Sequence, residues 1–225
     1  MKKLAVLSGA GVSKESGIQT FRDQDGLWEN YPVEDVASID GWYRDKKLVL
    51  KFYNDRRKEV KNTHFNKAHK LIAELEKHFD VNIITQNIDN LHEQAGSTKV
   101  LHLHGELTKA RSEADESLIR DIGYNDIHLG DLAEDGHQLR PHIVWFGEAV
   151  PNITKAAEII NHADILLVIG TSLVVYPAAG LVQYLPKGKP LYLIDPQKMN
   201  INYSNYEQIQ EVATKGMEIF TKQIL

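Results

Sequence analysis

The stretch LSGAGVSKESGIQTFR, residues 7–22, follows an apolar run and opens with a glycine-rich turn. Gly9 and Gly11 allow a tight turn and a close approach of backbone N–H groups to a phosphate, at the positive end of a following helix. A full G-x-G-x-x-G pattern would need glycine at position 14, where the chain has Lys14. Many short Gly-x-Gly segments are only turns, so the stretch alone indicates a nucleotide site weakly.

Short apolar runs recur along the rest of the chain, and helical patterns lie between several of them. The runs are KLAVLSG, VNIITQN, KVLHLHG, HIVWFG, ADILLVIGTS and KPLYLID. Residues 66–79 carry an apolar stripe with helical spacing directly before VNIITQN. Helices that alternate with continuous apolar strands predict an α/β fold, with a Rossmann-like parallel sheet covered by helices on both faces.

Two segments break this alternation, residues 23–64 and 109–140, and we interpret them as insertions that form a smaller lobe. The large Rossmann-like domain then consists of residues 1–22, 65–108 and 141–225. The second insertion is acidic and poor in apolar residues, so it is expected to pack loosely against the sheet domain.

The composition is that of an ordinary globular protein, with 225 residues, 42% of them hydrophobic, 25% charged, and a net charge of −5. The negative charge argues against nonspecific nucleic-acid binding. No apolar run approaches the roughly 20 residues of a membrane helix, and the N-terminus is not a convincing secretory signal. We therefore expect a cytoplasmic protein without a membrane partner. Cysteine is absent, which excludes disulfides, thiolate nucleophiles and cysteine-ligated zinc.

Polar residues follow four of the apolar runs, in SGAGVS, TQNIDNLH, LHGEL and GTS. In an open α/β sheet these strand ends meet where a ligand binds. Asn87 and Asp89 can bind ribose hydroxyls or a carboxamide, and Thr171 and Ser172 can meet phosphate or ribose oxygens near Gly170. Each alone is explained by a cap or turn, whereas their joint placement favours a nucleotide site.

These motifs together resemble the sirtuins, the NAD-dependent protein deacylases. The family pattern G-A-G-x-S-x-x-S-G-I-P-x-F-R is matched by residues 9–22, except that Gln19 replaces proline. TQNID, LH, HG, WFGE and GTS then occur in family order, so the resemblance covers nearly the whole chain. The chain is similar in particular to the desuccinylase-type class of bacteria and mitochondria.

The resemblance implies that the acyl group of a lysine is transferred to the ribose of NAD, with release of nicotinamide and formation of O-acyl-ADP-ribose. The histidine that activates a ribose hydroxyl is His104 by motif match, and its unperturbed pKa of about 6.5 suits a general base. His102 is rejected, because only His104 directly precedes Gly105 as the family pattern requires.

The resemblance also implies the cofactor contacts. The segment SKESGIQTFR would form a loop over the nicotinamide, and Asp195 stands where many sirtuins have asparagine. The implied cofactor-binding residues are Gly9, Ala10, Gly11, Phe21, Arg22, Gln86, Asn87, Ile88, Asp89, Gly170, Thr171, Ser172, Asp195 and Ala213.

For the acylated peptide, the resemblance implies that Val144, Phe146 and Gly147 flank the acyl-lysine and that an extended peptide adds to their backbone as a strand. Trp145 points to the other face and is interpreted as core.

Tyr53 and Arg56 lie three residues apart on a basic helix and share a face, so they can serve one ligand. An arginine fork and a tyrosine hydroxyl can recognise the acidic end of a succinyl or malonyl group. A solvated basic helix face is the ordinary explanation of such a pair. Their place matches that in desuccinylating sirtuins, and Ala37 resembles the small residue that leaves room for a longer acyl group.

The chain departs from the family in lacking the four zinc-binding cysteines between HG and WFGE. His128, His137 and His142 match no zinc signature and are interpreted as surface residues, so no metal is predicted. The lobe would then be held by packing alone, as a candidate for local mobility.

Two other classes of function remain open. Mono-ADP-ribosyl transfer or NAD hydrolysis would use the same pocket without an acyl-lysine channel, and a noncatalytic NAD or ADP-ribose sensor would need no base at position 104. No motif indicates the oligomeric state.

Overall fold

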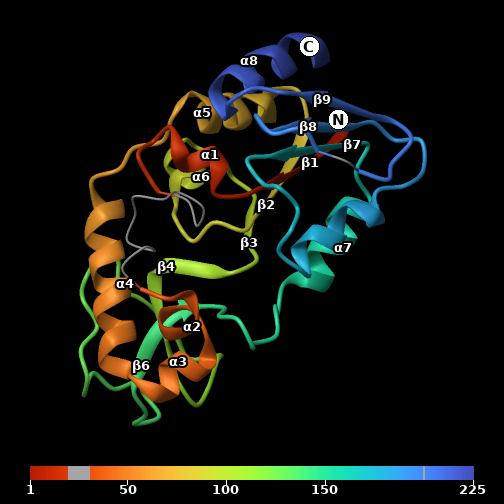
Figure 1. Cartoon of the computed structure of the whole chain (residues 1–225). Coiled ribbons are helices and arrows are strands. Elements are labelled where there is room, and N and C mark those ends of the chain that lie inside the picture. Colours follow the sequence, from red (N-terminus) through yellow and green to blue (C-terminus); the bar gives the residue numbers. More distant parts are fainter. Residues whose placement is uncertain (20–30, 200) are drawn as a thin grey trace.

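The computed structural model describes residues 1–19, 31–199 and 201–225, and it contains two sheets of different construction (Figure 1). The larger sheet has six strands in the order β3-β2-β1-β7-β8-β9, and every neighbouring pair is parallel. Its strands are β1 (Lys3–Ser8), β2 (Asp80–Thr85), β3 (Val100–His102), β7 (Ile165–Ile169), β8 (Leu191–Ile194) and β9 (Tyr206–Ile209). The predicted α/β fold with a Rossmann-like parallel sheet is confirmed.

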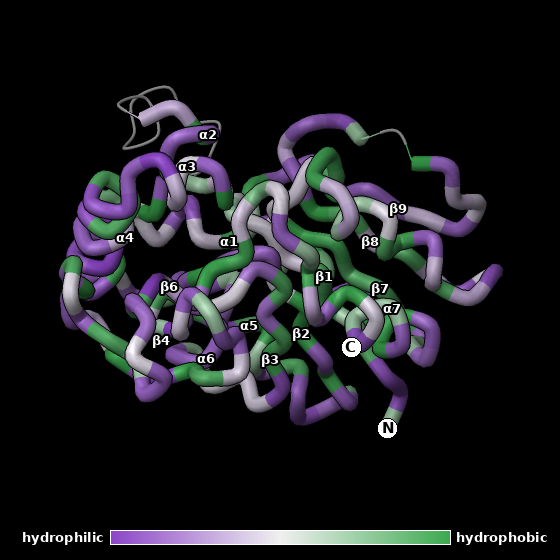
Figure 2. Tube along the Cα trace, turned by 90° about the horizontal axis from the view of Figure 1, so that it is seen from below, coloured by the Kyte–Doolittle hydropathy of each residue, from purple (hydrophilic) through white to green (hydrophobic). Residues whose placement is uncertain are grey.

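Helices cover both faces of this sheet, because successive side chains of its central strands point to opposite faces. Leu4 and Val6 pack with α5 (Lys67–Glu74) and α8 (Ala213–Ile224). Ala5 and Leu7 pack with α7 (Ile153–Asn161) and the 3₁₀ helix η3 (Ala178–Tyr184). Figure 2 shows the hydrophobic strands β1 and β7 in the middle of the molecule.

The helix predicted over residues 66–79 begins with Asn66 as its N-cap, and α5 ends at Glu74 before a short 3₁₀ helix, η2 (Leu75–Lys77). In the part of the chain that the structure describes, no helix has the length and apolar character needed to span a membrane.

The smaller sheet is antiparallel, with the order β5-β4-β6. Its strands are β4 (Gly105–Ser112), β5 (Ile119–Asp121) and β6 (Leu139–Ile143). Together with the helices α2 (Val33–Val36), α3 (Ile39–Arg44) and α4 (Lys46–Lys61) it forms the lower lobe of Figure 1. The small sheet thus begins before the predicted insertion 109–140 and ends beyond it.

The placement of HIVWFG, residues 142–147, among the strands of the parallel sheet was wrong. Its first residues end β6 and pair antiparallel with β4. An apolar run signals burial but not which core it joins. Here Trp145 packs against Trp42 of α3 with ring centroids 5.5 Å apart, in the core of the small lobe.

Buried charges also hold this lobe, so the expectation of packing alone was wrong. Glu148 binds Arg140 at 2.7 Å and Arg111 at 3.1 Å, and both arginine side chains are almost fully buried. The Arg140 guanidinium lies 3.5 Å from the ring centroid of Trp145. We call Arg111, Arg140, Trp145 and Glu148 the lobe cluster.

Candidate active site

The carboxyl ends of β1, β2 and β7 converge at one edge of the parallel sheet, as expected for neighbouring parallel strands. The loop after β2 joins the end of β1 through the bond from Gln86 N to the Ser8 carbonyl, at 2.9 Å. The Gln86 side chain reaches the loop after β7 by donating to Thr171 Oγ1 at 3.1 Å. Between β1 and β7 the strand order switches direction, which is where open α/β sheets bind ligands.

The backbone of the glycine turn packs against Gly170, and two of its N–H groups form hydrogen bonds within the chain. Gly9 N donates to the Ile169 carbonyl at 3.0 Å, and Gly11 N to the Gly170 carbonyl at 2.8 Å. A Cβ on Gly11 would lie 2.8 Å from Gly170 Cα, so the glycines serve this close backbone approach. The N–H groups of Gly9 and Gly11 are thus used within the chain, and the pyrophosphate contact of this turn stays a prediction. No described residue accepts from the N–H of Ala10, which lies between them.

A hydroxyl, an amide and a carboxylate form a buried network behind this turn. Ser13, in the short helix α1 (Gly11–Lys14), donates to Asp89 Oδ2 at 3.0 Å and accepts from Asn87 Nδ2 at 3.1 Å. His69 Nε2 lies 3.4 Å from the same hydroxyl. Asp89 also accepts from Leu91 N, and burial raises the pKa of its carboxyl while these two hydrogen bonds oppose the rise.

The tautomer of His69 follows from its neighbours. Its Nδ1 accepts from Asn66 N at 3.3 Å in the capping box of α5, so Nε2 carries the proton and points it at Ser13. Burial lowers the pKa of His69 to about 4, which keeps the ring neutral. A second buried histidine, His92 of α6 (Leu91–Gln94), binds Ser8 Oγ at 2.9 Å. Sequence reasoning missed both histidines.

His104 lies at the end of the same edge, between β3 and β4. Its Nδ1 is 3.0 Å from the Gln86 carbonyl, which can only accept, so Nδ1 carries the proton of the neutral ring. Nε2 then holds a lone pair, and no described residue binds it. Burial lowers the pKa of His104 below its ordinary value, while the bond to Gln86 opposes the shift. The neutral, basic form therefore persists below pH 6.5.

The backbone conformation at position 105 explains why glycine follows His104. Its φ is +81°, and an added Cβ would lie 2.0 Å from the His142 carbonyl oxygen. The chain turns there from the parallel sheet into β4, in a backbone conformation that favours glycine.

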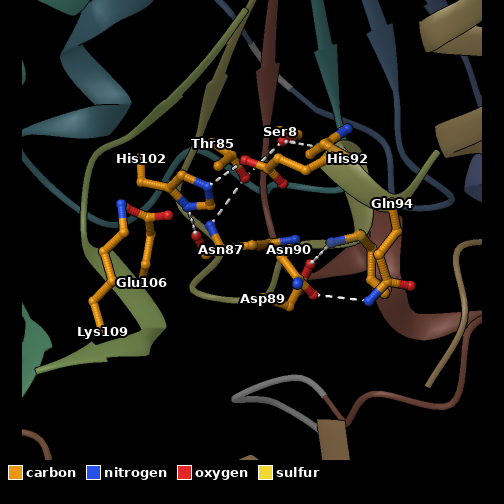
Figure 3. A network of polar contacts seen from close by, with 12 residues as sticks. Ser8, Thr85, Asn87, Asp89, Asn90, His92, Gln94, His102, Glu106 and Lys109 are labelled. Carbon is orange, nitrogen blue, oxygen red and sulfur yellow. Dashed lines mark hydrogen bonds and ion pairs between the residues drawn. The ribbon is translucent and has the colours of Figure 1, made fainter. Parts of the chain in front are cut away.

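His102, the histidine rejected as the base, is buried and bound on both ring nitrogens. Nδ1 lies 2.9 Å from the Asn87 carbonyl and Nε2 lies 2.8 Å from Glu93 Oε1. Figure 3 shows its ring beside Asn87, with the Ser8, Thr85 and His92 contacts in the same view.

The predicted acyl-binding pair lies in the small lobe. The Tyr53 hydroxyl accepts from Trp145 Nε1 at 2.8 Å, and burial raises the pKa of Tyr53. Arg56 pairs with Glu59 at 2.7 Å and donates to the Gln19 carbonyl at 2.9 Å. Neither side chain lies on a solvated helix face, because Tyr53 and Arg56 are 2% and 7% exposed.

The segment predicted to bind the peptide joins His104 to the acyl-binding region. Val144 N donates to the His104 carbonyl at 3.0 Å. Phe146 N donates to the Ala37 carbonyl, and the Phe146 carbonyl accepts from Ile39 N. Both backbone groups of Phe146 are thus paired within the chain, and the addition of a peptide strand to this segment stays a prediction. The Phe146 side chain is 52% exposed and Gly147 has a φ of +90°.

The remaining predicted residues fall into three groups. Asp195 follows β8 beside Gly170, whose N–H donates to the Ile194 carbonyl, and Ala213 opens α8. Ile88 accepts from Leu107 N through its carbonyl, and Ser172 follows Thr171 in the loop after β7. Phe21 and Arg22 lie outside the described residues. Among the described residues, no group of histidines and carboxylates is arranged to hold a metal ion.

Comparison with known proteins agrees with this arrangement. The profile of the Sir2 family matches residues 9–177. An NAD-dependent protein deacylase of Bacteroides thetaiotaomicron is 52% identical over 224 residues, which cover 97% of this chain and 96% of that protein. A Sir2 homologue crystallised with NAD has a TM-score of 0.89 at 37% identity, covering 99% of this chain and 89% of that one.

A more distant relative was solved with a peptide and a nucleotide. A Sir2 protein with a deacetylated p53 peptide and 3′-O-acetyl-ADP-ribose has a TM-score of 0.79 at 28% identity, covering 98% of this chain and 93% of that one. The fold and its sheet edge define a nucleotide-binding α/β enzyme whose cofactor is NAD. The chain belongs to the Sir2 family, a family of NAD-dependent deacylases.

Proposed function

We propose that this chain is an NAD-dependent protein deacylase that removes acyl groups from lysine side chains and prefers acidic ones such as succinyl and malonyl. The observation that carries the proposal is His104, a neutral imidazole at the converging strand ends whose Nε2 lone pair is unclaimed by any described residue.

The groups at the sheet edge fit the chemistry of NAD. The Ala10 N–H suits a pyrophosphate oxygen, and the Asn87 side-chain oxygen suits a ribose hydroxyl or the carboxamide. NAD, when bound, supplies the ribose that receives the acyl group and releases nicotinamide. The buried network of Ser13, Asn87 and Asp89 fixes the polar wall of this pocket before any ligand enters.

His104 would act as the general base of the transfer. With Nδ1–H held by the Gln86 carbonyl, Nε2 is the atom that takes a proton from a ribose hydroxyl. Its lowered pKa keeps this atom unprotonated at neutral pH.

The preference for acidic acyl groups is supported by donors that remain on Arg56 and Tyr53. A guanidinium carries five N–H donors, and among the described residues Arg56 uses two of them, for its bonds to Glu59 and Gln19. Tyr53 accepts from Trp145, which leaves its own O–H to donate. Buried donors of this kind favour an acyl chain that ends in a carboxylate.

Steady-state kinetics on acetyl, malonyl and succinyl versions of one peptide test the preference. Arg56→Met is expected to lower kcat/KM for the succinyl peptide about tenfold to a hundredfold, because it removes hydrogen bonds to a charged group. Deacetylation should change little. Lys58→Met removes an exposed cation from the same helix and serves as the control. Equal losses on the acetyl and succinyl peptides with Arg56→Met would refute the preference.

Product analysis separates deacylation from the other uses of NAD. A deacylase releases nicotinamide only with acyl-peptide present and forms O-acyl-ADP-ribose. Nicotinamide release without peptide would indicate NAD hydrolysis or ADP-ribosyl transfer, and binding without release would indicate a sensor.

A further inference from the structure

Asn87 is held at three of its four polar groups. Its N–H donates to Thr85 Oγ1 at 3.1 Å, and its side-chain Nδ2 donates to Ser13 Oγ at 3.1 Å. Its carbonyl receives the bond from His102 Nδ1 at 2.9 Å. Among the described residues only the side-chain oxygen, Oδ1, lacks a partner. The protein thus uses three hydrogen bonds to fix where this one acceptor points.

The ring of His102 makes its bond to Asn87 in an unusual way, because both ring nitrogens face acceptors. The Asn87 carbonyl can only accept, and so can the Glu93 carboxylate when it is ionised. A neutral imidazole has one N–H, so both contacts form together only when His102 is an imidazolium. The bond to Glu93 at 2.8 Å therefore fixes the charge state of the ring that holds Asn87.

We propose that His102, paired with Glu93, is a positioning residue of the cofactor pocket: its Nδ1–H fixes the Asn87 backbone so that Asn87 Oδ1 is presented to NAD. This role rests on the proposed function, because it requires NAD to bind at this sheet edge. It gives a purpose to the histidine that is two residues from His104 but makes no contact with the proposed base.

The charges around His102 favour its imidazolium form. Burial alone would lower the pKa of His102, but the hydrogen bond and charge of Glu93, with the bond to Asn87, raise it. Glu106 of β4 acts in the same direction, and Lys109 pairs with Glu106 at 2.5 Å (Figure 3). Burial would raise the pKa of Glu93, whereas its contacts with His102 lower it, which keeps the carboxylate ionised.

Two further groups face the same ring. Asp89 lies close enough for the charge of His102 to lower its pKa, and the same charge lowers the pKa of His92. The sign of the pH effect follows from the raised pKa of His102. The clamp on Asn87 is complete below that pKa, and it weakens as the pH rises through it, because the one proton of the neutral ring stays on Nε2 with the Glu93 carboxylate and a lone pair on Nδ1 then faces the Asn87 carbonyl.

A matched pair of substitutions separates the two bonds of the ring. In His102→Asn the side-chain amide occupies the position of ring Nδ1 and can donate to the Asn87 carbonyl. In His102→Gln the amide occupies the position of Nε2 and meets Glu93 instead. The Kd for NAD, measured by calorimetry, should rise about fivefold to tenfold in His102→Gln and stay within about twofold of wild type in His102→Asn. In steady-state assays of these variants, kcat at saturating NAD should change much less than the KM for NAD.

Glu93→Gln tests the charge without touching the ring. A neutral His102 can then donate to Asn87 and accept from the side-chain amide introduced at position 93, so the Kd should lose the rise with pH that wild type shows above the ordinary histidine pKa of 6.5. Asp135→Asn alters another histidine–carboxylate pair, with His137 in an exposed loop, and should keep the wild-type pH profile. Because Glu93→Gln retains His102, it decides the question even if both substitutions at 102 unfold the protein.

The outcomes are distinct. Equal Kd values for His102→Asn and His102→Gln, or the same alkaline rise in wild type and Glu93→Gln, would overturn the positioning role. Wild-type protein that binds NAD with the expected pattern but forms no O-acyl-ADP-ribose would overturn the proposed function and leave the positioning role supported. Wild-type protein that binds no NAD would overturn both.

Discussion

The cofactor edge and the small lobe both bury polar side chains, but most of those at the edge are neutral, whereas those in the lobe are mainly charged. At the edge, Ser8, Ser13, His69 and His92 are neutral groups that bond one another and the strand ends. In the lobe, the cluster around Glu148 joins two buried guanidinium groups to one carboxylate.

This difference reflects what each region has to hold. A pocket for an anionic dinucleotide gains from neutral hydrogen-bonding groups that are already oriented, because they cost little to reorganise when the ligand binds. The lobe has no cysteines for a metal, and the lobe cluster ties β4 and β6 to Trp145 instead. Replacing a residue of the cofactor edge should therefore lower activity, whereas replacing a residue of the lobe cluster should lower the free energy of unfolding.

The largest expected effect is at the edge, in His104→Asn. The asparagine amide can still donate to the Gln86 carbonyl, but no basic nitrogen remains at the position of Nε2. Formation of O-acyl-ADP-ribose should fall about a hundredfold to ten-thousandfold, the usual contribution of a general base. The free energy of unfolding should stay close to that of wild type. A large loss of stability with little loss of rate would reverse the comparison.

The next effect belongs to the lobe. Glu148→Gln leaves the buried Arg140 without a counter-charge and Arg111 with only the exposed carboxylate of Glu116, and the free energy of unfolding should fall by about 3–5 kcal/mol. Glu116→Gln changes an exposed carboxylate 3.4 Å from the same Arg111, and it should cost less than about 1 kcal/mol. Denaturant titration of both variants measures the contrast. Similar small losses would mean that apolar packing, and not the lobe cluster, holds the lobe.

A smaller effect, specific to the cofactor edge, is expected on stability when the pH is lowered. The folded-state pKa of His69, about 4, lies below the value of 6.5 for an exposed histidine, so on acidification the unfolded state binds the proton first. Stability from this group is present above pH 6.5 and is lost as the pH falls toward 4. Glu148 adds to this loss only toward the acid end of the range, because its pKa is lowered and the unfolded state therefore binds the proton first as the pH falls through the ordinary glutamate value of 4.5.

Unfolding curves across that range should therefore show a decline that is shallower in His69→Gln. His162→Gln, which changes an exposed histidine, is the control. An identical decline in wild type and His69→Gln would assign the acid sensitivity to other groups.

Local pattern was enough to predict the parallel sheet and the strand ends at which the candidate site lies. The runs that became β1, β2, β7 and β8 are apolar and buried, and the motifs GAG, TQNID, HG and GTS follow strands whose ends meet. Strand β9 was missed because its residues Tyr206 and Glu207 are exposed and give no apolar run.

What local pattern could not predict depends on contacts between distant residues. Ser8 and His92 are 84 positions apart, and nothing near either residue in the sequence indicates their bond. The contact of Arg111 with Glu148, over 37 positions, is of the same kind. One local signal was available: Asn66 and His69 have capping-box spacing, and the capping box fixes the tautomer of His69.

The most direct test of the account is a crystal structure of the protein with ADP-ribose. We predict that His104 Nε2 lies within about 3.2 Å of a ribose hydroxyl, the reach of a general base, while Nδ1 stays on the Gln86 carbonyl. An imidazole turned away from the sugar, or a ribose bound at another edge of the sheet, would contradict the central claim.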